Sequence, residues 1–326
     1  MKLIVQVPCF NEEMTLPLVI NSIPRKIRGV DEIETLIIDD GSSDNTIEVA
    51  EKLGVDHIVR HPQNRGLATS FADGLHEGLK QGADIIVNTD GDNQYPQASI
   101  PELIQTILDG THDIVVADRQ TNKIAHFSPF KKLLQRFGSR MVNLASGTDI
   151  PDAPSGFRAY SRHAAMSINV VTDFSYCMET IVQAGRKRIP ITHVPVVTNA
   201  KTRESRLFKN IGQHVRKSMA AIVRSYTMYK PFKVFLLSGL VSALIGLVPY
   251  VRYSMLVIAH NEKIAGHLQS LIFGAVFIML GVMFMVIGVV ADLLAINRKL
   301  LEDNLYHLKQ IEYDGLPFAA NSEPNH

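Results

Sequence analysis

The sequence has few cysteines, almost no net charge and no long apolar run at its N-terminus. Each of these absences argues against one class of protein. With only Cys9 and Cys177, a disulfide framework is not expected, and a reducing compartment is favoured. A net charge of +1 gives no basic excess, so no nucleic-acid partner is expected. The first apolar run is interrupted by Gln6 and Pro8, which favours a first strand over a signal peptide.

Two stretches near the C-terminus contain no charged side chain: Val234–Val251 and Leu268–Ala291. The second is long enough to cross about 30 Å of hydrocarbon, and the first approaches that length with Phe232 and Tyr250 as interface anchors. We predict two membrane helices. The alternative is a buried helical pair in a soluble protein.

The residues around these stretches predict an orientation. Apolar residues recur at helical spacing from Leu207 to Tyr226, with basic residues between them, so this segment is either a helix on an anionic leaflet or a surface helix packed on the preceding domain. Basic residues flanking the pair outnumber those in its connecting segment: Lys230, Lys233, Arg298 and Lys299 against Arg252 and Lys263. Both flanks are therefore expected in the cytoplasm.

The first 120 residues alternate short β-branched runs with helical stretches. The runs are "KLIVQVP", "TLIID", "HIVRH", "DIIVNTD" and "DIVVAD", and the helical stretches include Glu12–Ile23 and Asn45–Leu53. This alternation predicts an α/β fold with a mostly parallel sheet and flanking helices. Four strands are followed by polar or special residues, which should converge on one cleft: Pro8–Glu12, Asp39–Ser43, Asp90–Gln94 and Asp118–Arg119.

The motif "NTDGDNQYP" places Asp90 and Asp92 one residue apart at the end of a buried strand. Two such carboxylates repel each other unless a cation lies between them, which suits a hard divalent ion, Mg²⁺ or Mn²⁺, bound to a diphosphate. Gln94 adds a neutral oxygen ligand. The alternative is an Asx-type turn that caps the strand.

A second motif, "DAPSGFRAYSR", follows a poorly patterned stretch, 121–151, that is a candidate acceptor-covering loop. Ser155, Gly156 and Arg158 offer a hydroxyl, a backbone N–H and a guanidinium to an anion. An ordinary loop that closes onto the sheet is the alternative. His57 and His61 lack the spacing of metal ligands and are expected to be solvated or core residues.

Five motifs in one order carry a resemblance: "VPCFNEE", "IIDDGSSDNT", "NRGLA", "NTDGDNQYP" and "SGFRAYSR". Over about residues 1 to 210, the chain resembles the family 2 glycosyltransferases with a GT-A nucleotide-sugar-binding fold. The similarity is greatest to the polyprenyl-phosphate hexosyltransferases, the dolichyl-phosphate mannosyltransferase-like branch.

The resemblance implies roles for individual residues. Pro8, Phe10 and Glu12 line the nucleotide pocket, and Asp40 binds the base or ribose. The metal and donor-phosphate site is formed by Asp90, Gly91, Asp92 and Gln94. The expected catalytic residues are Asp92, Arg119, Arg158 and Glu179, with Arg119 on the diphosphate. Ser155 is expected to bind substrate.

The chain departs from the family pattern at two places. Phe10 stands where the family usually has tyrosine. In "KTRESRL", Arg203 takes the glycine place and Arg206 the lysine place of the segment implied to bind the acceptor phosphate. A guanidinium is at least as good a phosphate clamp as an ammonium.

These expectations define an organisation and a function. The expected divisions are a catalytic domain (1–205), an amphipathic juxtamembrane helix (206–231), two transmembrane helices (232–297) and a cytoplasmic tail (298–326). We expect a metal-dependent, inverting transfer of a hexose from a nucleotide sugar, GDP- or UDP-linked, to a polyprenyl phosphate. Membrane lipids are expected partners and a homo-oligomer is possible. The alternatives are a glycosyltransferase acting on a lipid or polysaccharide hydroxyl, and a non-catalytic nucleotide-sugar-binding membrane scaffold.

Overall fold

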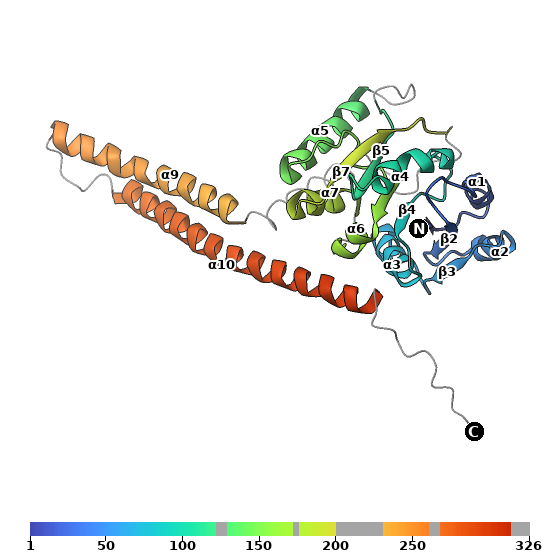
Figure 1. Ribbon diagram of the computed structural model, residues 1–326. Coiled ribbons are helices and arrows are strands. Elements are labelled where there is room, and N and C mark those ends of the chain that lie inside the picture. The colour runs from blue at the N-terminus through green and yellow to red at the C-terminus, as the bar shows by residue number, and fades with distance from the viewer. Residues whose placement is uncertain (122–128, 172–175, 200–230, 261–267, 314–326) are drawn as a thin grey trace. The chain divides into compact units, whose positions relative to one another are not determined.

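The computed structural model describes residues 1–121, 129–171, 176–199, 231–260 and 268–313. The chain divides into two compact units, Met1–Ser225 with Leu305–His326, and Tyr226–Asn304. The helix α10 (Leu268–Tyr313) contributes to both units, and every other described element lies in one of them (Figure 1).

The first unit contains a seven-stranded sheet in the order β3-β2-β1-β4-β6-β5-β7. The strands are β1 (Lys2–Cys9), β2 (Glu32–Asp39), β3 (His57–Arg60), β4 (Ile85–Asn88), β5 (Ile114–Asp118), β6 (Arg158–Ser161) and β7 (Ile191–Pro195). All neighbouring strands pair in parallel except β6, which is antiparallel to both β4 and β5. The mostly parallel α/β fold is thereby confirmed, and each of the five predicted runs forms a strand.

Helices connect and cover the strands. They are α1 (Leu16–Ser22), α2 (Thr46–Lys52), α3 (Leu67–Lys80), α4 (Ile100–Leu108) after a 3₁₀ turn η1 (Gln97–Ser99), α5 (Pro129–Ser146), α6 (Arg162–Ser167) and α7 (Tyr176–Lys187). The stretch 121–151, predicted to be a loop, instead contains the 18-residue helix α5.

The two faces of the sheet are covered by different helices. One core cluster joins Leu3 and Val5 of β1 to Leu16 of α1 and Leu103 of α4. The opposite face of β1 meets α3 at Gly74, where an added Cβ would lie only 2.6 Å from Gln6 Oε1. Burial on both faces explains why these strands are almost continuously apolar.

The last turns of α10 (Leu268–Tyr313) belong to the first unit from Leu305 onward. Lys309 Nζ donates to the backbone oxygens of Met166 (3.2 Å) and Ile168 (3.3 Å) and to Oδ1 of Asn169 (2.8 Å). The ammonium group thus binds the oxygens at the C-terminal end of α6, where a cation is favoured. The range 298–326 was expected to be a tail, and its first part is helical.

The second unit is a hairpin of α9 (Pro231–His260) and the first part of α10, the two candidate membrane spans. Small residues lie where the helices meet: a Cβ at Gly239 would lie 2.6 Å from the oxygen of Gly281, and one at Gly246 2.6 Å from that of Gly274. Ser242 Oγ donates to the oxygen of Phe277 (2.8 Å). Only 11% and 17% of the most apolar windows are buried, which argues against a pair of soluble core helices.

Candidate active site

The carboxyl ends of the central strands meet around Gly91. A Cβ atom at Gly91 would lie 3.2 Å from both Cys9 Sγ and Glu12 Cγ, and 3.5 Å from the backbone oxygen of Pro8. On the other side of β1, the backbone N–H of Asp40 donates to the oxygen of Cys9 (2.8 Å). The segments after β1, β2 and β4 therefore share one edge, as expected for parallel strands.

The loop after β4 is shaped by its own side chains. Gln94 donates to Asp92 twice, from its backbone N–H (3.1 Å) and from Nε2 (2.9 Å). Asn93 adopts a left-handed φ of 57°, which asparagine tolerates better than most residues. From outside, the backbone N–H of Asn199 donates to Gln94 O (2.9 Å) and its Nδ2 to Asn93 O (3.0 Å). Gln94, predicted as a metal ligand, thus holds Asp92 directly.

Asp90 lies against Gly156, on the loop that precedes β6. A Cβ at Gly156 would be 3.0 Å from Asp90 Oδ1 and 3.0 Å from the Tyr176 hydroxyl, so a side chain here must displace its neighbours. Gly156 is fixed from both sides: its N–H donates to the Tyr95 hydroxyl (3.0 Å), and its oxygen accepts from Asn88 Nδ2 (2.8 Å). The Gly156 loop therefore packs against the Asp90 carboxylate and limits its movement.

The edge formed by these loops is strongly negative. Burial raises the pKa of the Cys9 thiol well above its usual value, and four carboxylates raise it further: Glu12, Asp39, Asp44 and Asp90. Burial also raises the pKa of Tyr95, to about 12, with Asp90 and Asp152 adding to the rise and Arg119 opposing it. Such an accumulation of carboxylates favours a bound cation.

The residues present fit one kind of metal site. Within the described parts of the chain, no group of three or more His, Cys, Asp or Glu side chains is placed to hold a metal. Asp90 and Asp92 offer the hard oxygen donors that Mg²⁺ and Mn²⁺ prefer, and Mg²⁺ is commonly held by one or two carboxylates together with substrate phosphates. The donor set fits an ion shared with a phosphorylated ligand.

Arg119, predicted to contact a diphosphate, is held by Asp152. Its Nε donates to Asp152 Oδ2 (2.7 Å) and its Nη2 to Oδ1 (2.8 Å), and its backbone N–H also donates to Oδ2 (3.1 Å). Burial alone lowers the pKa of Arg119, but the nearby Tyr95 and Asp152 raise it well above its usual value. The forked pair fixes the guanidinium close to Asp90.

Arg158 and Ser155 are fully buried. Arg158 donates from Nε to Ser155 O (2.7 Å), from Nη2 to Ala153 O (2.6 Å), and from Nη1 to Cys177 O (2.8 Å) and Thr180 Oγ1 (2.7 Å). Its guanidinium therefore donates to three backbone oxygens and to the Thr180 hydroxyl, all within the protein. This geometry makes Arg158 a residue that positions the Gly156 loop, in place of the catalytic contact predicted for it.

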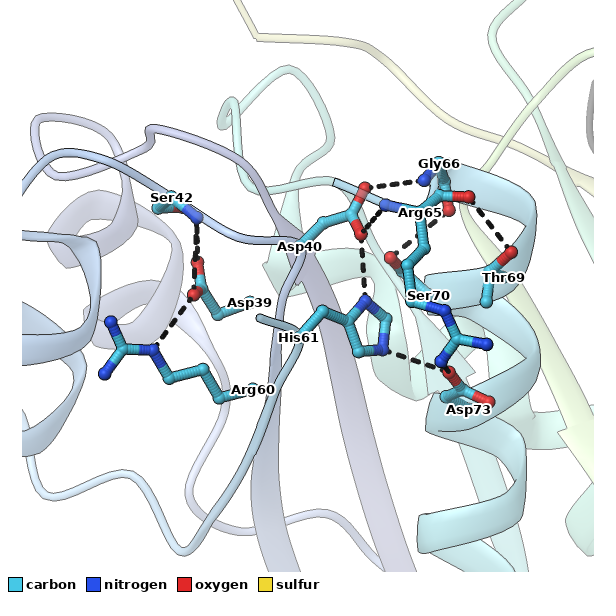
Figure 2. Close-up of polar contacts among 10 residues, drawn as sticks. All are labelled: Asp39, Asp40, Ser42, Arg60, His61, Arg65, Gly66, Thr69, Ser70 and Asp73. Atoms are coloured by element: carbon cyan, nitrogen blue, oxygen red, sulfur yellow. Dashed lines mark hydrogen bonds and ion pairs between the residues drawn. The ribbon is translucent and has the colours of Figure 1, made fainter. Parts of the chain in front are cut away.

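Asp40, predicted to bind the base or ribose, organises the start of α3 (Figure 2). Its carboxylate accepts from the backbone N–H groups of Arg65 (2.8 Å) and Gly66 (2.9 Å). It also contacts His61 Nδ1 (2.9 Å), and His61 Nε2 contacts Asp73 Oδ2 (3.0 Å). His61 is buried, which is one of the two environments expected for it.

An open pocket of about 370 Å³ lies beside this network, at the carboxyl ends of β2 and β3. Its lining residues are Gly41, Ser42, Arg60, His61 and Pro62. Asp39 lies beneath it, accepting from Ser42 N–H (3.1 Å) and forming an ion pair with Arg60 Nε (3.9 Å). The pocket is thus a small open recess lined by polar groups and by Gly41 and Pro62.

The remaining predicted residues lie in different surroundings. Phe10 is 39% exposed, whereas the Glu12 carboxylate is buried and accepts from Thr15 Oγ1 (2.7 Å). Glu179, near the start of α7, is buried and accepts from Val171 N–H (3.3 Å) and Gln183 Nε2 (3.4 Å). Arg203, Arg206 and the amphipathic segment lie outside the described residues.

Among the residues of the site that were not predicted are Asp152, Tyr95 and His61. Asp152 and Tyr95 lie inside the quoted motifs "DAPSGFRAYSR" and "NTDGDNQYP". The carboxylate of Asp152 and the hydroxyl of Tyr95, within motifs already singled out, could have marked both as site residues. His61 had no signal of its own, because both of its carboxylate partners come from other elements.

Comparisons with known proteins agree with this geometry. A model of the family described as glycosyl transferase family 2 matches residues 4–168. The UDP-N-acetylglucosamine–dolichyl-phosphate N-acetylglucosaminyltransferase of Methanococcus voltae is 28% identical over 213 residues, covering 59% of this chain and 83% of that protein. The dolichyl-phosphate hexose transferase of Haloferax volcanii is 27% identical over 198 residues, covering 61% and 83%.

Solved structures share the fold. A glucosyl-3-phosphoglycerate synthase from Mycobacterium tuberculosis, crystallised with Mn²⁺, UDP and glucosyl-3-phosphoglycerate, superposes with a TM-score of 0.53 at 21% identity. The match covers 69% of this chain and 79% of that chain. The expected nucleotide-sugar-binding fold is confirmed, and two long apolar helices follow it.

Proposed function

The chain belongs to glycosyl transferase family 2, and from this premise we propose that it transfers a hexose from a nucleotide sugar to a polyprenyl phosphate at a membrane surface. The observation that carries the proposal is the acidic loop of Asp90 and Asp92, on the same sheet edge as the polar pocket, in a chain with two apolar helices. The relatives named above act on dolichyl phosphate, and another, from Micrococcus luteus, is an undecaprenyl-phosphate mannosyltransferase.

The spacing along the sheet edge suits a nucleoside diphosphate. The pocket lies at β2 and β3, and the Asp90–Asp92 loop follows β4, with β1 between them. Neighbouring strands are about 4.8 Å apart, so two to three spacings separate the pocket from the loop by roughly 10–14 Å. An extended nucleoside diphosphate has a similar length, which places the nucleoside in the pocket and the phosphates at the loop.

The chemistry follows from this placement. Asp90 and Asp92 would hold a divalent ion, with Gln94 orienting Asp92 and the Gly156 loop supporting Asp90. When bound, that ion supplies Lewis-acid neutralisation of the charge on the departing diphosphate. Arg119, fixed by Asp152, adds positive charge on the same side.

A phosphate acceptor suits this site because it is already ionised at pH 7 and needs no general base. One of its oxygens attacks the anomeric carbon while the bond from that carbon to the diphosphate oxygen breaks. Attack opposite the leaving group inverts the configuration. Asn199 ties the chain to the Asp92 loop, and Arg203 and Arg206 follow it within seven positions, so we assign them to the acceptor phosphate.

We place the catalytic unit in the cytoplasm. The basic residues around the two spans favour both flanks on that side. The chain from Leu305 onward belongs to the same compact unit as the catalytic sheet. Both flanks of the pair of spans must then lie on one side of the membrane, which agrees with two crossings.

The decisive experiment incubates the purified full chain, in detergent, with a panel of radiolabelled nucleotide sugars and undecaprenyl or dolichyl phosphate. Label in the organic phase identifies donor and acceptor together. Asp92→Asn should lower transfer by about 10²-fold or more, because it weakens the ion's contact with the diphosphate. Asp109→Asn, on an exposed helix end, is the matched control and should leave transfer unchanged. Transfer to a hydroxyl acceptor alone would refute the proposal.

The acceptor assignment has its own test. Arg206→Ala should sharply lower transfer in detergent, where no anionic leaflet exists, and leave nucleotide-sugar binding unchanged by calorimetry. Arg28→Ala, an exposed arginine of the first unit, is the control. If only membrane association weakens in Arg206→Ala, the arginine binds lipid head groups and not the acceptor phosphate.

A further inference from the structure

His61 lies between two carboxylates. Its two ring nitrogens face Asp40 at 2.9 Å and Asp73 at 3.0 Å. An ionised carboxylate can only accept, so a hydrogen bond at each nitrogen requires a hydrogen on both. With both carboxylates ionised, the ring that makes both bonds carries a positive charge.

The surrounding charges balance only when this ring is positive. The groups that face it or its partners come from β2, β3 and α3 and the loop between them: Asp39, Asp40 and Asp73 against Arg60, Arg65 and His61. Arg65 Nη1 pairs with Asp73 Oδ2 (3.2 Å), and Arg60 pairs with Asp39 (3.9 Å). Three negative and three positive charges cancel, and a neutral residue at position 61 leaves one negative charge in excess.

This cluster stands at the wall of the 370 Å³ pocket, to which His61 and Arg60 both contribute. We propose that His61 is a positioning residue for the donor: it links Asp40 to Asp73 and keeps the pocket wall electrically neutral toward a nucleoside diphosphate. The inference rests on the proposed function only in taking the pocket's ligand to be the donor nucleotide. An excess negative charge at this wall repels the two phosphates of the bound nucleotide across the roughly 10–14 Å that separate the pocket from the Asp90–Asp92 loop.

The test measures nucleotide affinity and not transfer. The full chain in detergent is titrated calorimetrically with UDP and with GDP in the presence of Mn²⁺. His61→Gln should weaken binding of the nucleotide that the wild type prefers by about fivefold or more. His57→Gln is the matched control, because His57 begins β3, the strand that ends just before His61, and contacts one carboxylate, Glu34, away from the pocket. It should leave affinity unchanged.

Charge rescue separates this role from a merely structural one. The double variant His61→Gln/Asp73→Asn removes one charge of each sign and should recover affinity to within about twofold of wild type. A structural role predicts that the double variant binds at least as weakly as His61→Gln. Asp73→Asn alone should bind as tightly as wild type or tighter, which keeps the test open even where His61→Gln fails to fold.

Each result has a distinct meaning. Wild type that binds a nucleotide, with His61→Gln binding it equally well, overturns this inference alone. Nucleotide binding without transfer to polyprenyl phosphate overturns the proposed acceptor and leaves His61 in place. A wild type that binds neither UDP nor GDP overturns both.

Discussion

Gly156→Ala is the substitution that probes the Asp90 site most directly. The new methyl group would lie 3.0 Å from Asp90 Oδ1 and 3.0 Å from the Tyr176 hydroxyl, where ordinary contact begins at 3.4 Å. Gly156 is tied to Tyr95 and Asn88 and cannot retreat freely, so the Asp90 carboxylate must move by about 0.4 Å. Metal-ligand distances tolerate about 0.2 Å, so a shift of this size would remove the carboxylate from the ligating position that we propose for it.

We expect three measurable results. Turnover in the transfer assay should fall by roughly 10- to 100-fold, because misplacements of this order disturb reacting groups. Overpacking should cost about 1–3 kcal/mol of unfolding free energy, seen as a lower midpoint in thermal unfolding. Titration with Mn²⁺ should require a higher concentration for half-maximal activity.

Gly138→Ala is the matched control. An added Cβ there meets nothing within 4 Å, in the helix α5, so the change should leave turnover alone and stabilise the helix by up to about 1 kcal/mol. Equal turnover in the two variants, with the same demand for Mn²⁺, would show that the contact between Gly156 and Asp90 does not support the reaction.

Three further predictions concern stability, thiol reactivity and topology. Asp152→Ala leaves the largely buried Arg119 without its partner and should cost about 3 kcal/mol in chemical denaturation; a loss below about 1 kcal/mol would mean that the guanidinium finds another partner. The raised pKa values of Cys9 and Cys177 keep both thiols protonated at pH 8, so iodoacetamide should label neither until denaturant is added, and rapid labelling of the native chain would contradict this. A cysteine introduced at Asn261 should react with an impermeant thiol reagent outside intact cells, and failure to react while the control position Ser322 does would reverse the topology.

The sequence predicts the strands that contain a β-branched apolar run, and it fails where polar or exposed residues interrupt that run. The runs of β1, β2, β4 and β5 were identified because burial on both faces demands apolar residues, and half-buried β3 was identified by Ile58 and Val59. The strand β6, "RAYS", begins with a buried arginine and has no apolar run, and β7, "ITHVP", is an edge strand with a half-exposed pattern. Helix α5 was missed because its many basic and polar residues obscure a helical spacing that Met141, Val142 and Ala145 still show.

At the site, local motifs are predictable and long-range pairings are not. Asp90 and Asp92 follow a strand, so their place at the sheet edge could be derived from the sequence. The partnership of Arg119 with Asp152 joins residues 33 positions apart, and nothing local indicates it. Arg158 was predicted to bind an anion because it carries a guanidinium. Only the structure shows that oxygens of the protein itself accept its hydrogen bonds.

The reversed strand β6 has a consequence for the order in which the nascent chain folds. β5 leaves the ribosome before β6, yet β6 lies between β4 and β5 in the finished sheet. Until residues 158–161 are synthesised, one edge of β4 is unpaired. β5 can pair with that edge, which β6 occupies in the finished sheet. The loop that supports Asp90 precedes this strand, so the active site is among the last parts of the sheet to form. A ribosome paused near residue 150 should therefore hold a chain that binds chaperones, and one paused beyond residue 230 should not.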